Sequence, residues 1–236
     1  MATVIFESRE TTSQSPTFIC PPRAGNATTL HVLLTAFEPY AEWPQNSSWL
    51  ALVELLKNRP THLELTTRRY PVELAALRKQ LHEDLQTDYD AVLHLGQSPG
   101  TSAIKLEAIA LNVAGCVMDA GQELPNLIES APLAFRSQMP LARWADALRE
   151  SGIPAKISYH AGTFLCNATM YLTHYWYQSR GVHRPVGFVH LPLATEQVAR
   201  GTAIFPSLPQ ATLGRSLDIL LKELSAMNAA SQRRLA

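Results

Sequence analysis

The stretch ISYHAGTFLCNATMYLTHYWYQ, residues 157–178, shows a strand followed by a helix, a pattern that recurs along the rest of the chain. A short apolar run ends at His160, and a longer run with helical spacing follows, with Cys166 at its start. Short apolar runs bounded by turn residues favour buried strands, and the longer periodic run favours a helix. A thiol at the N-terminus of a helix is more acidic than a buried structural cysteine. The position of Cys166 therefore raises the question whether it is a nucleophile or a packing residue.

The same alternation of strand and helix extends in both directions from this stretch. Strands are predicted at 30–37, 63–71, 89–100, 154–160 and 184–193, and helices at 46–58, 72–86, 140–152, 166–180 and 211–228. The pattern is weak between 101 and 130, where 104–113 fits either a strand or a helical turn. Strands that alternate with helices predict parallel βαβ units, with helices on both faces of one sheet.

The composition favours a single globular domain. Of the 236 residues, 46% are hydrophobic and 17% are charged, and 20 basic residues balance 20 acidic ones. This balance argues against a nucleic-acid groove or a polybasic membrane surface. Three scattered cysteines argue against a disulfide framework and for a reducing compartment. Residues 1–30 lack the features of a signal peptide, so we expect a cytoplasmic protein with a flexible leader at 1–30 and a folded domain at 31–236.

Sites in parallel α/β sheets gather beyond the carboxyl ends of the strands. In this chain the rule selects residues 37–40, Gln97, Cys166 and His190, all expected at one edge of the sheet. One helix and one strand separate Cys166 from His190, which predicts that the two follow adjacent parallel strands. A cysteine nucleophile needs a base, and the base is oriented by a third group. The segment with Glu107 could supply that carboxylate.

Each of these residues also has an ordinary structural interpretation. Cys166 could be a packing residue, His190 a hydrogen-bonded core residue and Glu107 a strand residue that faces solvent. A metal site made of Cys166, His190 and His160 is disfavoured because the paired ligand spacings of metal sites are absent. GQSPGTS, residues 96–102, lacks the lysine of a phosphate-binding loop.

Four motifs resemble those of pyroglutamyl peptidase I, also called the pyrrolidone-carboxylate peptidase family. The nucleophile motif of that family is matched by Ser158, Ala161, Gly162, Phe164, Cys166, Asn167 and Tyr171. GFVHLPLATEQ, residues 187–197, is similar to its histidine motif, and LHLGQSPG with LEAIALNV, within 93–113, resembles its glutamate segment. VLLTAFEPY, residues 32–40, with the downstream Asn46, resembles the opening segment of the family. The order and spacing hold from residue 31 to about residue 200.

The resemblance implies an α/β/α sandwich, no metal or cofactor, possible homo-oligomers, and peptides with N-terminal pyroglutamate as substrates. It implies Cys166 as nucleophile, His190 as base and Glu107 as the orienting carboxylate. For the pyroglutamyl ring it implies five contacts: Phe37, Tyr40 and Phe164, with Asn46 and Gln97 as polar contributors.

The chain departs from the family pattern near the expected site. Ala108 and Thr101 stand where the family usually has arginine, Tyr40 replaces a phenylalanine, and Ala41-Glu42 replaces a Gly-Gly pair. Two alternatives follow. One is a family member that binds a lactam or peptide end without efficient turnover. The other is a different small-molecule enzyme on a similar sheet, such as a nucleoside phosphorylase.

Overall fold

The computed structural model describes residues 29–115, 123–199 and 204–233. The predicted leader therefore lies almost entirely outside the described residues, and so do Cys20 and Cys116. The remaining cysteine, Cys166, is a free thiol.

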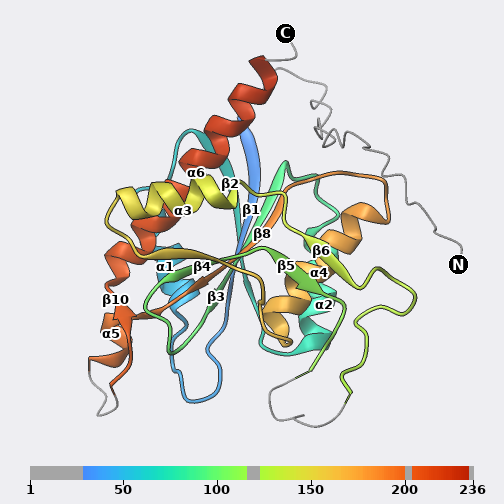
Figure 1. Ribbon diagram of the computed structural model, residues 1–236, viewed down its shortest axis with the longest axis horizontal. Coiled ribbons are helices and arrows are strands. Elements are labelled where there is room, and N and C mark those ends of the chain that lie inside the picture. Colours follow the sequence, from blue (N-terminus) through green and yellow to red (C-terminus); the bar gives the residue numbers. More distant parts are fainter. Residues whose placement is uncertain (1–28, 116–122, 200–203, 234–236) are drawn as a thin grey trace, which may run out of the picture.

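The central sheet has six strands in the order β2-β1-β3-β8-β4-β7 (Figure 1). These strands are β1 (Leu30–Phe37), β2 (Leu63–Tyr70), β3 (Ala91–Gln97), β4 (Ile104–Glu107), β7 (Ala155–Ser158) and β8 (Val186–Leu191). β1 pairs in parallel with β2 and β3, and β3 pairs in parallel with β8. β4 runs antiparallel to β8 and parallel to β7, so the last two strands of the sheet are reversed. Two small sheets pair β5 (Ile109–Leu111) with β6 (Ala134–Arg136), and β9 (Leu193–Ala194) with β10 (Ser207–Leu208).

One prediction about the sheet is wrong. Cys166 and His190 do not follow adjacent parallel strands, because β4 lies between β7 and β8 and reverses the direction. Glu107 pairs with Ser158 on one side and with Phe188 on the other, so β7 ends at the level of the middle of β8. Cys166 therefore reaches the site through the loop after β7 and the start of the next helix.

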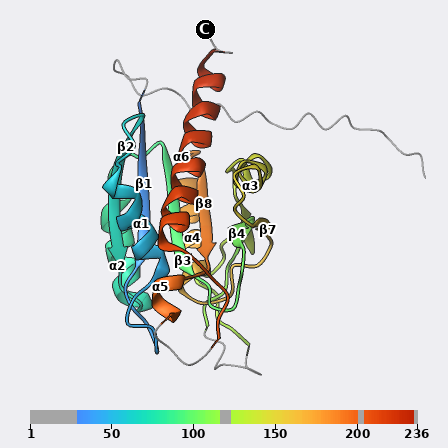
Figure 2. The ribbon, with the colours of Figure 1, turned by 90° about the vertical axis from the view of Figure 1, so that its left-hand side faces the viewer.

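Helices cover both faces of the sheet, which confirms the predicted α/β/α sandwich (Figures 1 and 2). The helices are α1 (Ser47–Lys57), α2 (Leu74–Asp84), α3 (Leu141–Glu150), α4 (Leu165–Gln178), α5 (Thr195–Val198) and α6 (Gln210–Arg233). α6 packs against α1 and α3 on one face, and α2 packs against α4 on the other. Among the described residues no helix combines the length and the apolar character that a bilayer crossing requires.

The residues of β1 explain why the sheet is buried on both sides. Val32 and Leu34 belong to the core beneath α1 and α6, whereas Leu33 belongs to the core beneath α2 and α4. Successive side chains of a strand point to opposite faces, so a continuous apolar run buries both. α3 ends where predicted, because Gly152 adopts a φ of +76° directly after its last turn.

Candidate active site

A buried carboxylate orients a buried histidine at the centre of the sheet. Glu107, at the end of β4, is fully buried, and its Oε1 lies 2.8 Å from Nδ1 of His190 on β8. An ionised carboxylate can only accept a hydrogen bond, so Nδ1 is the atom that holds the proton. The lone pair of Nε2 is then available on the opposite side of the ring. Antiparallel pairing makes this contact possible, because it sets Glu107 opposite Phe188, two residues before His190.

Cys166 lies at the start of α4, two residues after the N-cap residue Phe164. The first backbone hydrogen bond of this helix runs from Ala168 N–H to the carbonyl of Phe164, at 3.0 Å. The N–H groups of Leu165, Cys166 and Asn167 therefore have no acceptor within the helix. Such free N–H groups and the helix dipole stabilise negative charge near a helix N-terminus. This location favours negative charge on an oxygen atom bound beside Cys166.

The thiol is packed closely against β3. A methyl group added to Gly96 would lie 3.1 Å from Sγ of Cys166 and 2.7 Å from Cζ of Phe188. Gly96 also pairs in register with His190 on β8. The absent side chain at Gly96 thus allows the thiol to approach the strand pair that carries the histidine.

Electrostatics couple the three side chains. Burial by itself would lower the pKa of His190, but Cys166 and Glu107 outweigh burial and raise that pKa to about 9. Cys166 acts through its charge and a side-chain hydrogen bond, and Glu107 acts in the same two ways. Oε2 of Glu107 makes no hydrogen bond to any described residue. A buried carboxylate with one free oxygen needs a nearby positive charge, and His190 supplies it once it has accepted a second proton.

Residues 30–226 match the sequence model of a family described as pyroglutamyl peptidase. This chain belongs to the pyroglutamyl peptidase family. It is 33% identical over 195 residues to the pyrrolidone-carboxylate peptidase of Streptomyces coelicolor, covering 80% of this chain and 89% of that protein. For the pyrrolidone-carboxylate peptidase of Thermococcus onnurineus the identity is 32% over 198 residues, with 82% and 98% covered.

Solved structures of pyroglutamyl peptidase relatives share the fold. The crystal structure of pyrrolidone carboxyl peptidase from Fervidobacterium islandicum AW-1 is similar with a TM-score of 0.77 at 30% identity, covering 84% of this chain and 99% of that chain. The enzyme from Thermococcus litoralis gives a TM-score of 0.76 at 27% identity, with 87% and 96% covered.

The residues expected to contact the ring lie in different environments. Phe37 is buried, with its ring centroid 6.4 Å from that of Phe188. Tyr40 is half-buried, and burial raises its pKa, with Cys166 adding to the rise and Gln97 opposing it. Gln97 acts through a side-chain hydrogen bond and Cys166 through its charge, so Tyr40 lies close to Gln97 and within electrostatic range of the thiol. Phe164, the N-cap residue of α4, is 44% exposed.

Asn46 serves the fold directly. It is the N-cap of α1, where its Oδ1 accepts from the backbone N–H and the hydroxyl of Ser48. Its Nδ2 donates to the carbonyl of Glu38, at 3.0 Å. These bonds fix the turn that carries Tyr40, so any effect of Asn46 on a bound ring passes through this turn.

The positions that depart from the family pattern offer no cation to the site. Ala108 is 1% exposed, and its N–H donates to the carbonyl of Ser158. The hydroxyl of Thr101 donates to the carbonyl of Ala103 and shapes the turn after β3.

Two supporting residues were not selected from the sequence as site residues. Asn167, next to the nucleophile, is fully buried, and its amide bonds the backbone of Leu111 and Val113, which fixes the start of α4 against β5. Gln197 binds Gln97, at 2.9 Å between Nε2 and Oε1. Both lie inside the motifs that carry the family resemblance, which was the available signal.

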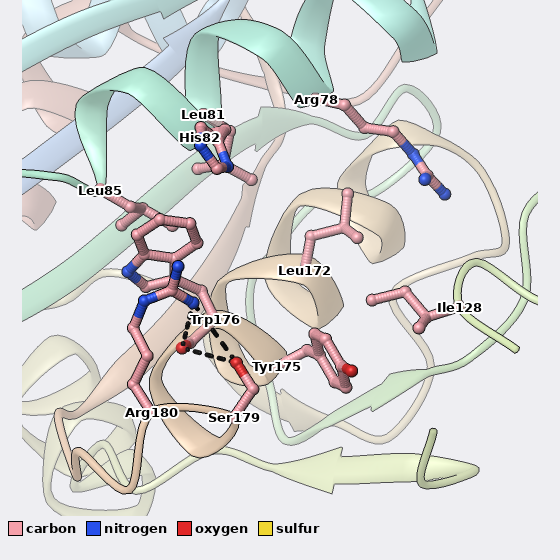
Figure 3. Close-up of a pocket in the computed structure, with 10 residues that line it drawn as sticks. All are labelled: Arg78, Leu81, His82, Leu85, Ile128, Leu172, Tyr175, Trp176, Ser179 and Arg180. Atoms are coloured by element: carbon pink, nitrogen blue, oxygen red, sulfur yellow. Dashed lines mark hydrogen bonds between the residues drawn. The ribbon is translucent and has the colours of Figure 1, made fainter. Parts of the chain in front are cut away.

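A separate cavity of about 340 Å³ lies between α2 and the second half of α4 (Figure 3). Arg180 covers one of its walls, with its guanidinium carbon 3.2 Å from the centroid of the Trp176 ring. No thiol lines this cavity, and its α4 residues begin at Leu172, well past Cys166. This cavity is therefore separate from the start of α4, where Cys166 lies. Among the described residues no group of three or more metal-binding side chains is clustered.

Proposed function

We propose that this protein is a cysteine exopeptidase that removes N-terminal pyroglutamyl residues from peptides. The observation that carries the proposal is the bond of 2.8 Å between Glu107 and His190, together with the thiol of Cys166 packed against Gly96, the residue that pairs with His190. A nucleophile, a base and a group that orients the base are the three parts that thiol catalysis needs. Family membership supplies the substrate class.

In the proposed reaction, Nε2 of His190 takes the proton from the thiol of Cys166. The resulting thiolate attacks the carbonyl carbon of the pyroglutamyl residue, and the negative charge forms on its oxygen. The free N–H groups at the start of α4 stabilise that charge. The C–N bond then breaks, and protonated His190 gives its proton to the leaving amine. A water molecule, deprotonated by His190, hydrolyses the thioester and releases pyroglutamate and the free thiol.

We assign recognition of the five-membered ring to Phe37, Tyr40 and Phe164, with Gln97 as the polar contributor and Asn46 as the residue that holds the turn. Aromatic side chains suit the flat faces of a lactam, and a few polar groups suit its amide edge. This assignment places the activity in the domain at 31–236 and requires no cofactor. The few cysteines support a cytoplasmic location.

The test compares three conjugates with the same fluorescent leaving group: pyroglutamyl, prolyl and glutamyl. The prolyl ring lacks the lactam carbonyl and carries a protonated amine, so a site built on buried hydrogen bonds should discriminate by about 10⁴-fold or more in kcat/KM. Cys166→Ala and His190→Ala serve as inactive controls. Cleavage of prolyl and pyroglutamyl conjugates at similar rates would contradict the proposal. Binding of the pyroglutamyl conjugate without cleavage would instead identify a family member without turnover.

A further inference from the structure

The amide group of Gln97 has a defined orientation. One atom of its side chain accepts hydrogen bonds from the backbone N–H of Ser47, at 2.8 Å, and from Nε2 of Gln197, at 2.9 Å. A backbone N–H can only donate, so this atom is the oxygen Oε1. The nitrogen Nε2 of Gln97 therefore points away from Ser47 and Gln197.

Gln197 is itself held in one orientation. Its Oε1 accepts from the backbone N–H of Ala194, at 2.7 Å. Its Nε2 donates one hydrogen to the carbonyl of Gln45, at 2.8 Å, and the other to Gln97. Both hydrogens of the Gln197 amide are used, and a rotated amide would place a nitrogen against the N–H of Ala194. Gln197 thus connects α5 to the end of β3 and to the turn before α1.

The nitrogen of Gln97 is a buried donor with no acceptor at normal hydrogen-bond geometry. Gln97 is 6% exposed, and its Nε2 makes no hydrogen bond to any described residue. A buried donor without an acceptor destabilises the protein, so it commonly marks a place where a ligand binds. The Gln97 side chain lowers the pKa of Tyr40 through a hydrogen-bonding interaction, so its nitrogen faces the Tyr40 hydroxyl without reaching normal hydrogen-bond geometry. Cys166 raises the pKa of Tyr40 through its charge, so Tyr40 and the nitrogen of Gln97 lie within electrostatic range of the thiol.

We propose that Gln197 is a positioning residue for substrate selection, because it holds the Gln97 amide with its nitrogen toward the lactam carbonyl of the bound ring. The inference rests on the proposed function. A rotated Gln97 would present its oxygen to the carbonyl oxygen, and two acceptors repel. Together, Gln97 and Gln197 therefore favour a ring that carries a carbonyl beside its nitrogen over a ring that lacks this carbonyl.

The experiment uses 2-pyrrolidone, which has the ring, the N–H and the carbonyl but no scissile bond. Its ability to protect Cys166 from iodoacetamide measures ring binding without turnover. Gln197→Met removes the donor at similar length and should raise the protecting concentration and the KM for the pyroglutamyl conjugate about tenfold, the size expected for one lost hydrogen bond. The alkylation rate without 2-pyrrolidone and kcat should remain unchanged. Gln210→Met, a change at a glutamine of α6 that binds Glu54, is the matched control and should leave all four values unchanged.

A double variant separates positioning from general support. In a Gln97→Met background, Gln197→Met should have no further effect on protection, because both changes lose the same hydrogen bond from Gln97 to the ring carbonyl. Additive losses, or a slower alkylation rate in Gln197→Met alone, would overturn the inference. If 2-pyrrolidone protects the wild-type thiol but the conjugate is not cleaved, the peptidase proposal falls while the protection data still decide the role of Gln197. If 2-pyrrolidone gives the wild type no protection, the inference is wrong whether or not the conjugate is cleaved.

Discussion

His190 and His94 are two buried imidazoles on neighbouring strands, and their surroundings give them opposite properties. His190 lies on β8 and His94 on β3, and the ring of Phe188 lies near both, with centroids 4.8 Å from His190 and 6.3 Å from His94. His94 is fully buried and His190 is 7% exposed. Burial therefore does not distinguish the two residues, and their hydrogen-bond partners must.

His94 is surrounded by hydroxyl groups. The hydroxyl of Thr173 donates to the carbonyl of Thr169, so its oxygen must accept from Nε2 of His94, at 2.9 Å. Nδ1 then accepts from the hydroxyl of Thr35, at 2.7 Å. Both ring nitrogens are satisfied by a neutral ring, and burial, helped by His174, lowers the pKa of His94 to about 3. For His190, the neighbouring Cys166 and Glu107 outweigh burial and raise the pKa to about 9.

The difference teaches that the partner groups decide what a buried histidine can do. His190 faces a thiol and a carboxylate, so it can exchange a proton. His94 connects β1 and β3 to Thr173 on α4, so it holds the helix that carries Cys166 at its start. One ring is equipped for chemistry, and the other fixes the element on which that chemistry depends.

Glu107→Gln should have the largest effect, because it removes the charge that distinguishes His190 from His94. We expect kcat/KM to fall by about 10³- to 10⁴-fold, less than in Cys166→Ala. Protonated His190 gives its proton to the leaving amine, so activity should decline above the pKa of about 9. Without the carboxylate that pKa falls, and the decline should begin at a lower pH. A full pH profile measures both effects, and an unchanged basic limb would remove Glu107 from the site.

Gly96→Ala should have the next largest effect, because Gly96 lies against the thiol and against Phe188, the ring that neighbours both histidines. The new methyl group would lie 2.7 Å from Phe188 and 3.1 Å from the thiol, so both must move. A displacement of about 1 Å in a reacting group can reduce the rate by about 10²-fold. We expect that loss in kcat/KM together with slower iodoacetamide labelling. Gly100→Ala is a control. Gly100 has a φ of +82°, so a side chain there strains the backbone, but an added Cβ would meet no atom beyond the neighbouring residues within 4 Å and would not touch the thiol.

His94→Phe should have the smallest effect on activity and a clear effect on stability. The ring is retained, but the buried hydroxyls of Thr35 and Thr173 lose their partner, which costs about 1–3 kcal/mol per unsatisfied group. We expect a lower free energy of unfolding with kcat/KM reduced by less than about tenfold, provided that α4 keeps its place. Denaturant unfolding and the cleavage assay measure the two quantities. A loss of activity as large as that in Glu107→Gln, at unchanged stability, would contradict the structural role.

His94 and His190 should make the stability of the folded state depend on pH in opposite directions. The folded state cannot protonate His94 until about pH 3, whereas the unfolded chain does so near 6.5, so stability falls as the pH drops between these values. The folded state keeps the proton of His190 up to about pH 9, so that contribution is lost as the pH rises from 6.5 to 9. His94→Phe should therefore weaken the acid dependence, and His190→Ala should weaken the alkaline one.

The sequence predicts most elements of this fold and the identity of the candidate site residues. β1, β3 and β8 are apolar runs, and α2 and α4 have helical periodicity, so hydrophobic patterning alone places them. The direction of β4 and β7 could not be predicted, because periodicity gives a strand's faces and not its orientation. β4 lies in the weak segment 101–130, and its insertion beside β8 is what brings Glu107 to His190.

Nothing in the sequence separates His94 from His190 by composition alone, since both interrupt apolar runs. Their difference arises from Thr35, Thr173 and Glu107, which come from other elements and meet the rings only in the folded chain. The orientation of Gln97 depends in the same way on Gln197, 100 residues away. Such contacts are long-range, and a single sequence offers no local signal for them.

The protonation state of the two histidines tests the central claim most directly. The measurement is a pH titration of the imidazole Cε1–H resonances by NMR, assigned with His190→Ala and His94→Phe. We predict that His190 titrates near pH 9 and shifts to a lower value in both Cys166→Ser and Glu107→Gln, whereas His94 stays neutral down to strongly acidic pH. A titration of His190 at or below the ordinary value of 6.5, unaffected by either substitution, would contradict the account.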